Sequence, residues 1–176
     1  MTGILRVALK ETMHQQTMPK DVSEMSEKDV RARIVLLGFN NDERLFRAFT
    51  KKLQAGLPEQ TGIVLRGSVV TNTRWEDGGP FDSCGKGTSD LDVTLVGSKV
   101  MEFWNEDGFY IPGLHTKPLC DQDQEVAPGL NPLRLSLQKL AGRPVNFQAT
   151  ANLVLYTRDV LFDEAYFTLV EAGDDS

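Results

Sequence analysis

Two carboxylates separated by one residue form the part of this sequence best suited to chemistry. Asp90 and Asp92 precede the apolar residues Val93, Leu95 and Val96, which are typical of a strand anchored in a core. Because side chains alternate across a strand, both carboxylates project from one face, with Cα atoms about 6–7 Å apart. Such a pair can share one or two hard cations, which prefer oxygen ligands. The sequence therefore predicts a divalent-cation site at the exposed start of a strand.

A glycine and a serine follow a second strand-like run, about twenty residues earlier. Residues 63–66 are apolar up to Arg66, and Gly67 and Ser68 come next. At a corner between a strand and a helix, backbone N–H groups and a hydroxyl can bind a phosphate. The two motifs together predict a site for a ligand that carries phosphate and a metal ion.

In this order the motifs resemble the signature of the nucleotidyltransferase superfamily to which DNA polymerase β belongs, in its small bacterial form. That signature is a strand, Gly-Ser, a short helix and Asp-x-Asp at the start of the next strand, and the resemblance covers roughly residues 44–150. It implies transfer of a nucleoside monophosphate from a nucleoside triphosphate to an acceptor hydroxyl. It also implies that Gly67 and Ser68 hold the β,γ-phosphates, while Asp90 and Asp92 hold Mg²⁺ or Mn²⁺. The alternative is a capped turn that leads into an ordinary strand.

The family has a third carboxylate on a neighbouring strand, and here the sequence departs from the pattern. The candidate strand is residues 143–149, and by similarity the place of the acid belongs to Asn146. An amide oxygen can ligate a cation weakly, but an amide cannot act as a general base. Three explanations stay open: the third strand lies elsewhere, another acid substitutes, or the protein binds a nucleotide without transferring it.

Residues 71–87 are rich in glycine and polar residues and are longer than the connection expected between the two motifs. Loops of this length usually cover or build a site, or are disordered. Arg74 and Lys86 could meet the outer charges of a triphosphate, and Trp75 or Phe81 could stack on a base. The alternative is a solvated flap with one aromatic side chain pinned to the core.

Composition limits the classes of protein and partner. The chain has 176 residues, of which 40% are hydrophobic and 25% charged, as expected for one soluble globular domain. It lacks an apolar run of eighteen residues, so no membrane partner is expected. The net charge of −6 argues against binding of duplex DNA through its phosphate backbone. Cys84 and Cys120 lie far apart, and we interpret them as free thiols in the reducing cytoplasm.

The helices and strands expected around these residues together predict an α+β fold, in which helices pack mainly on one face of a short mixed sheet. Helices are expected to begin at Ser26 and at residues 41–44, and a last helix is expected over residues 163–171. Residues 1–26 show no clear periodicity of apolar residues, so we expect an arm that is mobile or contacts another copy. We expect residues 27–176 to form a single domain. Strands are expected at residues 63–66, 90–96, 145–149 and 153–156.

The acceptor stays open between a small molecule, a protein side chain and an RNA end. The chain is short for a separate acceptor-binding domain, so residues 71–87, residues 101–130 or a partner chain would have to supply that surface. A second hypothesis is a nucleotide-binding or partner-binding protein with a degenerate site, suggested by Asn146. A third is a purely structural interaction module.

Overall fold

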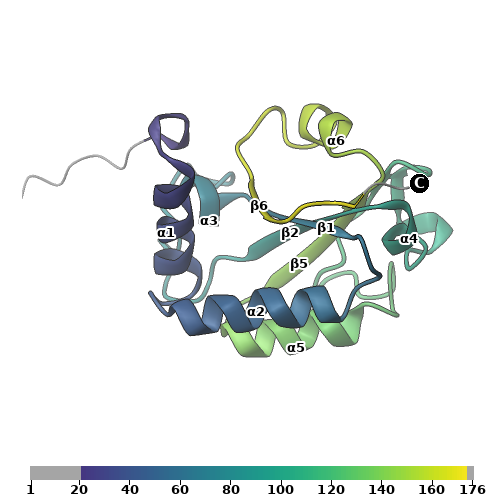
Figure 1. The fold of residues 1–176 in the computed structure, drawn as a ribbon, viewed down its shortest axis with the longest axis horizontal. Coiled ribbons are helices and arrows are strands. Elements are labelled where there is room, and N and C mark those ends of the chain that lie inside the picture. Colours follow the sequence, from purple (N-terminus) through teal and green to yellow (C-terminus); the bar gives the residue numbers. More distant parts are fainter. Residues whose placement is uncertain (1–20, 174–176) are drawn as a thin grey trace, which may run out of the picture.

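The computed structural model describes residues 21–173, which form an α+β fold around a six-stranded mixed sheet (Figure 1). The strand order is β3-β4-β5-β2-β1-β6. The strands are β1 (Gly62–Arg66), β2 (Leu91–Val96), β3 (Phe109–Ile111), β4 (His115–Thr116), β5 (Val145–Thr150) and β6 (Phe167–Val170). The helices are η1 (Val22–Glu24), α1 (Glu27–Gly38), α2 (Glu43–Ala55), α3 (Ser68–Thr71), α4 (Ser98–Met101), η2 (Glu106–Gly108), α5 (Asn131–Ala141) and α6 (Leu153–Asp159).

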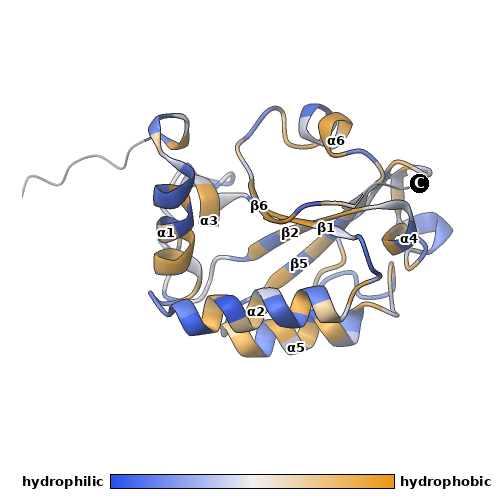
Figure 2. Ribbon diagram, in the orientation of Figure 1, coloured by the Kyte–Doolittle hydropathy of each residue, from blue (hydrophilic) through white to orange (hydrophobic). Residues whose placement is uncertain are grey.

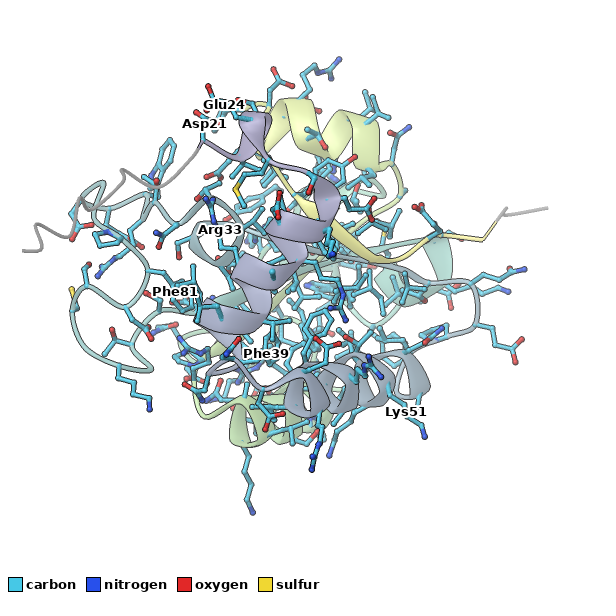
Figure 3. All side chains as sticks on the ribbon, turned by 60° about the vertical axis from the view of Figure 1, so that its left-hand side comes forward. Asp21, Glu24, Arg33, Phe39, Lys51 and Phe81 are labelled. Carbon is cyan, nitrogen blue, oxygen red and sulfur yellow. The ribbon has the colours of Figure 1, made fainter. Side chains whose placement is uncertain are left out.

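One face of the sheet is apolar. Leu65, Val93 and Phe147 lie opposite one another on β1, β2 and β5, and all three are fully buried. α2 and α5 lie side by side along the sheet (Figure 1), and apolar residues of both helices belong to the same core. Polar and apolar residues alternate along α2 (Figure 2), and its Lys51 points to solvent (Figure 3). This amphipathic layer holds the central strands in place.

Both predicted helix starts are confirmed. The Ser26 side chain accepts a hydrogen bond from the backbone N–H of Asp29 at the start of α1. The Asp42 side chain accepts from the N–H groups of the first turn of α2. Side-chain oxygens at these positions satisfy N–H groups that have no partner within the helix.

The other face of the central strands is polar. Arg66, Asp92 and Asn146 lie side by side across β1, β2 and β5, because β1 pairs antiparallel and β5 parallel with β2. In the next row of this face Thr94 lies opposite Gln148. α6 lies on the opposite side of the sheet from α2 and α5 (Figure 1), so the helices do not all share one face. The register thus concentrates polar side chains at one end of three adjacent strands.

Two predicted elements near the C-terminus are wrong. Residues 153–156 were expected to form a strand but begin α6, because Asn152 caps the helix by accepting from the backbone N–H of Leu155. Residues 163–171 were expected to form a helix but contain β6, which pairs with the free edge of β1. The first difference therefore has a local cause, the cap at Asn152, and the second a long-range one, the pairing of β6 with β1.

Most of the predicted N-terminal arm, residues 1–20, lies outside the described residues. The described end of that segment contains η1, whose Asp21 side chain accepts from the backbone N–H of Ser23. Among residues 21–173, no helix combines the length and apolar character needed to span a bilayer.

Candidate functional site

Three predicted site residues meet at the polar end of the sheet. The side-chain Nδ2 of Asn146 donates to Asp90 Oδ2 at 2.7 Å and to Asp92 Oδ1 at 3.1 Å. Asp90 immediately precedes β2, and Asn146 lies directly opposite Asp92 in the parallel pairing. The strand that carries Asn146 is therefore the neighbour of the acidic strand, and its amide bridges both carboxylates.

The predicted phosphate motif lies against the same carboxylates. Gly67 has φ 73° and ψ −156°, a conformation almost restricted to glycine, and it precedes Ser68 at the start of α3. A Cβ added at Gly67 would lie 2.9 Å from Asp92 Oδ2. The corner therefore needs glycine both for its backbone angle and for the close approach of the Asp92 carboxylate.

Arg66 lies beneath this cluster and supports it. Its Nη1 lies 3.9 Å from Asp92 Oδ2, and its Nε donates to Thr94 Oγ1 at 3.1 Å. Its Nη2 also donates to Gln148 Oε1, which accepts a second hydrogen bond from the Tyr156 hydroxyl of α6 at 2.9 Å. The network holds the Arg66 guanidinium in place, so that its positive charge lies near the Asp92 carboxylate.

Asp90 and Asp92 of this cluster line a cleft of about 370 Å³, whereas Asn146, which donates to both of them, is not among the lining residues. Of the predicted nucleotide-binding residues, Gly67, Ser68 and Arg74 line the cleft, whereas Lys86 is exposed and is not among the lining residues. Trp75 also lines it. The remaining lining residues are Arg66, Thr73, Glu76, Thr88, Ser89, Asp90, Asp92, Val160, Leu161, Phe162 and Glu164.

The long loop beside the cleft is anchored to the body of the protein. Arg143, at the start of the β5 segment, donates to both carboxylate oxygens of Asp82 at 2.9 and 3.2 Å and to the Ser89 carbonyl at 3.1 Å. Its guanidinium also stacks over the ring of Phe81, which is buried. Phe81 is thus the aromatic residue pinned to the core, and the loop positions Asp90 through its neighbour Ser89.

Arg74 is held within this loop. Its Nη1 donates to Ser83 Oγ at 3.2 Å and to Cys84 Sγ at 2.6 Å, and its Nε lies 3.6 Å from carboxylate oxygens of both Glu76 and Asp77. The guanidinium therefore reaches the cleft with its charge already balanced by neighbouring acids.

Two residues of the opposite segment, Phe162 and Glu164, were missed in the sequence. They lie about seventy residues from Asp92, and β6 brings them to the cleft by pairing with β1. No local motif marks them, because their placement depends on that long-range pairing. Arg66 did carry a signal, since a charged residue ends an otherwise apolar strand directly before Gly67.

Two carboxyl groups of the cleft, those of Asp90 and Glu164, have raised pKa values. Partial burial and the neighbouring Asp92 raise the pKa of Asp90 above its ordinary value, although the hydrogen bond from Asn146 opposes the shift. Burial also raises the pKa of Glu164, with Arg66 opposing and Asp92 adding to the effect. A cation at this floor would relieve the repulsion.

The donor set suits one hard cation. Among residues 21–173, no group of three or more His, Cys, Asp or Glu side chains is arranged to hold a metal ion. Asp90 and Asp92 are two carboxylates, and Mg²⁺ is commonly bound by one or two carboxylates together with waters and substrate phosphates. Asp90 and Asp92 therefore provide oxygen donors of the kind that a Mg²⁺ ion would need in addition to waters or a phosphate.

Comparisons of the chain with models of protein families, with curated proteins and with solved structures give no match.

Proposed function

We propose that this protein is a nucleotidyltransferase that binds a nucleoside triphosphate with Mg²⁺ or Mn²⁺ in the cleft and transfers a nucleoside monophosphate to an acceptor hydroxyl. The observation that carries the proposal is the convergence of Asp90, Asp92 and the Gly67-Ser68 corner on one cleft floor. A carboxylate pair for a cation beside a glycine corner for phosphate is the combination that this reaction needs.

In this reaction the acceptor oxygen forms a bond to the α-phosphorus, and the bond from that phosphorus to the pyrophosphate oxygen breaks. When bound, the metal ion neutralises charge on the phosphates. Asp90 and Asp92 would hold the ion, and Gly67, without a Cβ, would leave room for phosphate oxygens. The Asn146 amide cannot accept the proton of the attacking hydroxyl, so solvent or another group would have to take it.

The Asn146 side chain presents its Nδ2 to both carboxylates. If a metal ion were bound there, the amide oxygen of Asn146 could serve only as a weak ligand.

The second candidate is a protein that binds the Mg²⁺–nucleotide without transferring it. Asn146 favours this candidate, because its amide stands beside the two acids where the resemblance calls for a third. A missing general base typically costs about 10²–10⁴-fold in rate, so slow transfer remains compatible with the first candidate.

One assay tests both candidates. The protein is incubated with Mg²⁺ and ATP labelled at the α-phosphate, with a panel of small alcohols, RNA ends and proteins including itself. Transfer is expected to release pyrophosphate and label an acceptor, and to disappear in the double variant Asp90→Asn, Asp92→Asn. Nucleotide binding without label transfer would favour the second candidate, and absence of Mg²⁺-dependent nucleotide binding would refute both.

A further inference from the structure

Two exposed aromatic side chains border the cleft. Trp75 is 85% exposed and Phe162 is 73% exposed, and both line the same cleft as Asp90 and Asp92. An aromatic side chain stabilises a fold mainly when it is buried, so two large rings left in solvent at one site contribute little to folding. Their common location indicates that they serve a ligand.

The backbone beneath each ring is held in a defined conformation. Trp75 lies in a turn in which Arg74 N–H donates to the Gly79 carbonyl at 2.8 Å and Gly78 N–H donates to the Arg74 carbonyl at 2.9 Å. The side chains are therefore presented by an ordered turn.

Phe162 stands on a turn of unusual geometry. Phe162 and Asp163 have φ angles of 51° and 63°, in the left-handed region that non-glycine residues seldom adopt. The turn is closed by hydrogen bonds from Asp163 N–H to the Thr157 carbonyl at 3.0 Å and from Glu164 N–H to the Leu161 carbonyl at 2.9 Å. Strained backbone of this kind clusters at ligand sites, where it holds a side chain in a required position.

We infer that Trp75 and Phe162 form a stacking platform for the base of the bound nucleotide. The inference rests on the proposed function, and it adds the recognition of the nucleoside part. One cleft then combines two requirements: the polar floor takes the metal and the phosphates, and the aromatic border takes a planar ring. Phe81, the other aromatic residue of the loop, is buried under Arg143 and is not available for stacking.

Stacking on aromatic side chains is worth enough to measure. Alanine substitution at a base-stacking residue typically weakens binding by roughly 5- to 150-fold, and the effect tolerates any base because each base has a π face. A ligand that has the phosphates but lacks the base gains nothing from the platform. Comparison of ATP with inorganic triphosphate therefore isolates the contribution of the base.

The experiment measures dissociation constants for Mg²⁺–ATP and for Mg²⁺–inorganic triphosphate by calorimetry. The variants are Trp75→Ala and Phe162→Ala, with Tyr110→Ala as the matched control. Tyr110 is 59% exposed on β3 and is not among the cleft residues. Each cleft variant is expected to weaken ATP binding by roughly 5- to 150-fold and to leave triphosphate binding unchanged, while Tyr110→Ala changes neither.

A conservative variant provides a second readout. Trp75→Phe keeps a stacking ring and is expected to retain ATP affinity. ATP is expected to quench the tryptophan fluorescence of the parent, and this quenching should be lost in Trp75→Phe. ATP binding by the parent that neither alanine variant weakens would overturn the platform and leave the proposed function standing. Equal weakening of ATP and triphosphate would also overturn it. A parent that binds neither ligand would overturn the proposed function and the platform together.

Discussion

At the scale of single residues, the amide of Asn146 is the feature that separates this cleft from a site built on three acids. Its Nδ2 donates to both carboxylates, whereas a third carboxylate at this position would repel them. An amide also ligates a cation more weakly than a carboxylate and cannot act as a general base.

The first prediction concerns Asn146→Asp. The added charge should tighten Mg²⁺ binding and raise the rate of pyrophosphate release, by up to about 10²–10⁴-fold if the new carboxylate acts as a base. It should also lower the melting temperature in the absence of Mg²⁺. Asn146→Ala is the control, because it removes the amide without adding charge. Unchanged Mg²⁺ affinity in the Asp variant would place the cation elsewhere.

Asp90 gives a prediction about pH. Because folding raises its pKa, the native state binds this proton more tightly than the unfolded chain. The contribution of Asp90 to the free energy of unfolding is therefore full below the ordinary pKa of about 4 and is lost as pH rises through the folded value.

Asp90→Asn should consequently raise the melting temperature at pH 7 and leave it unchanged near pH 3. The asparagine keeps an acceptor for Asn146, and it removes the repulsion with Asp92. Thermal unfolding at both pH values measures the effect, and Mg²⁺ titration of the variant should show weakened binding. A lower melting temperature at pH 7 would contradict the expected repulsion.

Gly67 can be tested against a matched glycine. Gly67→Ala should lower the free energy of unfolding by about 1–3 kcal/mol, because its backbone angles suit almost no other residue. The new Cβ should also displace the Asp92 carboxylate and weaken Mg²⁺–nucleotide binding. Gly113 has φ 70° with no atom within 4 Å of an added Cβ. Gly113→Ala should therefore lose stability without weakening Mg²⁺–nucleotide binding. Equal loss of binding in both variants would assign Gly67 a purely structural role.

At the scale of elements, the loop between α3 and β2 acts as a fixed wall. Arg143 is 2% exposed in its side chain, and it joins the loop residues Asp82 and Ser89 to the Leu37 carbonyl at the end of α1. Burial opposes the ionisation of Asp82, but hydrogen bonds from Arg143 and from two backbone N–H groups outweigh it and hold the Asp82 pKa below its ordinary value. The pair therefore ties a loop, a helix and the entry to β5 together.

Arg143→Ala should lower the free energy of unfolding by about 3–5 kcal/mol, since it leaves a largely buried carboxylate without its partner. Asp82→Asn preserves the shape of the pair and should cost less. Both variants should also weaken Mg²⁺–nucleotide binding, because Ser89 directly precedes Asp90. Chemical denaturation and calorimetry measure the two effects. Normal nucleotide binding by a folded Asp82→Asn protein would show that the loop does not position the site.

At the scale of the whole molecule, surface charge limits the partners. The net charge of −6 and the acidic cleft oppose the phosphate backbone of a duplex. We expect no binding of a 20-base-pair duplex at micromolar protein and about 0.15 M salt, measured by fluorescence anisotropy. Tight, salt-dependent binding of the duplex would reveal a basic surface that the net charge conceals.

The sequence by itself determined the parts of the site that depend on local pattern. Short apolar or alternating runs at residues 63–66, 90–96 and 145–149 predicted the three central strands, and the one-residue spacing of Asp90 and Asp92 predicted their common face. The similarity to a known motif order then pointed to Asn146. These inferences need only the periodicity of a strand and the spacing of a few polar residues.

Only the tertiary structure decided what surrounds those residues. The parallel register of β2 and β5 placed the Asn146 amide between two carboxylates, and the pairing of β6 with β1 brought Phe162 and Glu164 to the cleft. In the folded protein Lys86 is not among the residues that line the cleft, and Phe81 is buried. Sequence reasoning could not reach these outcomes, because contacts between residues tens of positions apart depend on how the elements pack, and packing overrides local propensity.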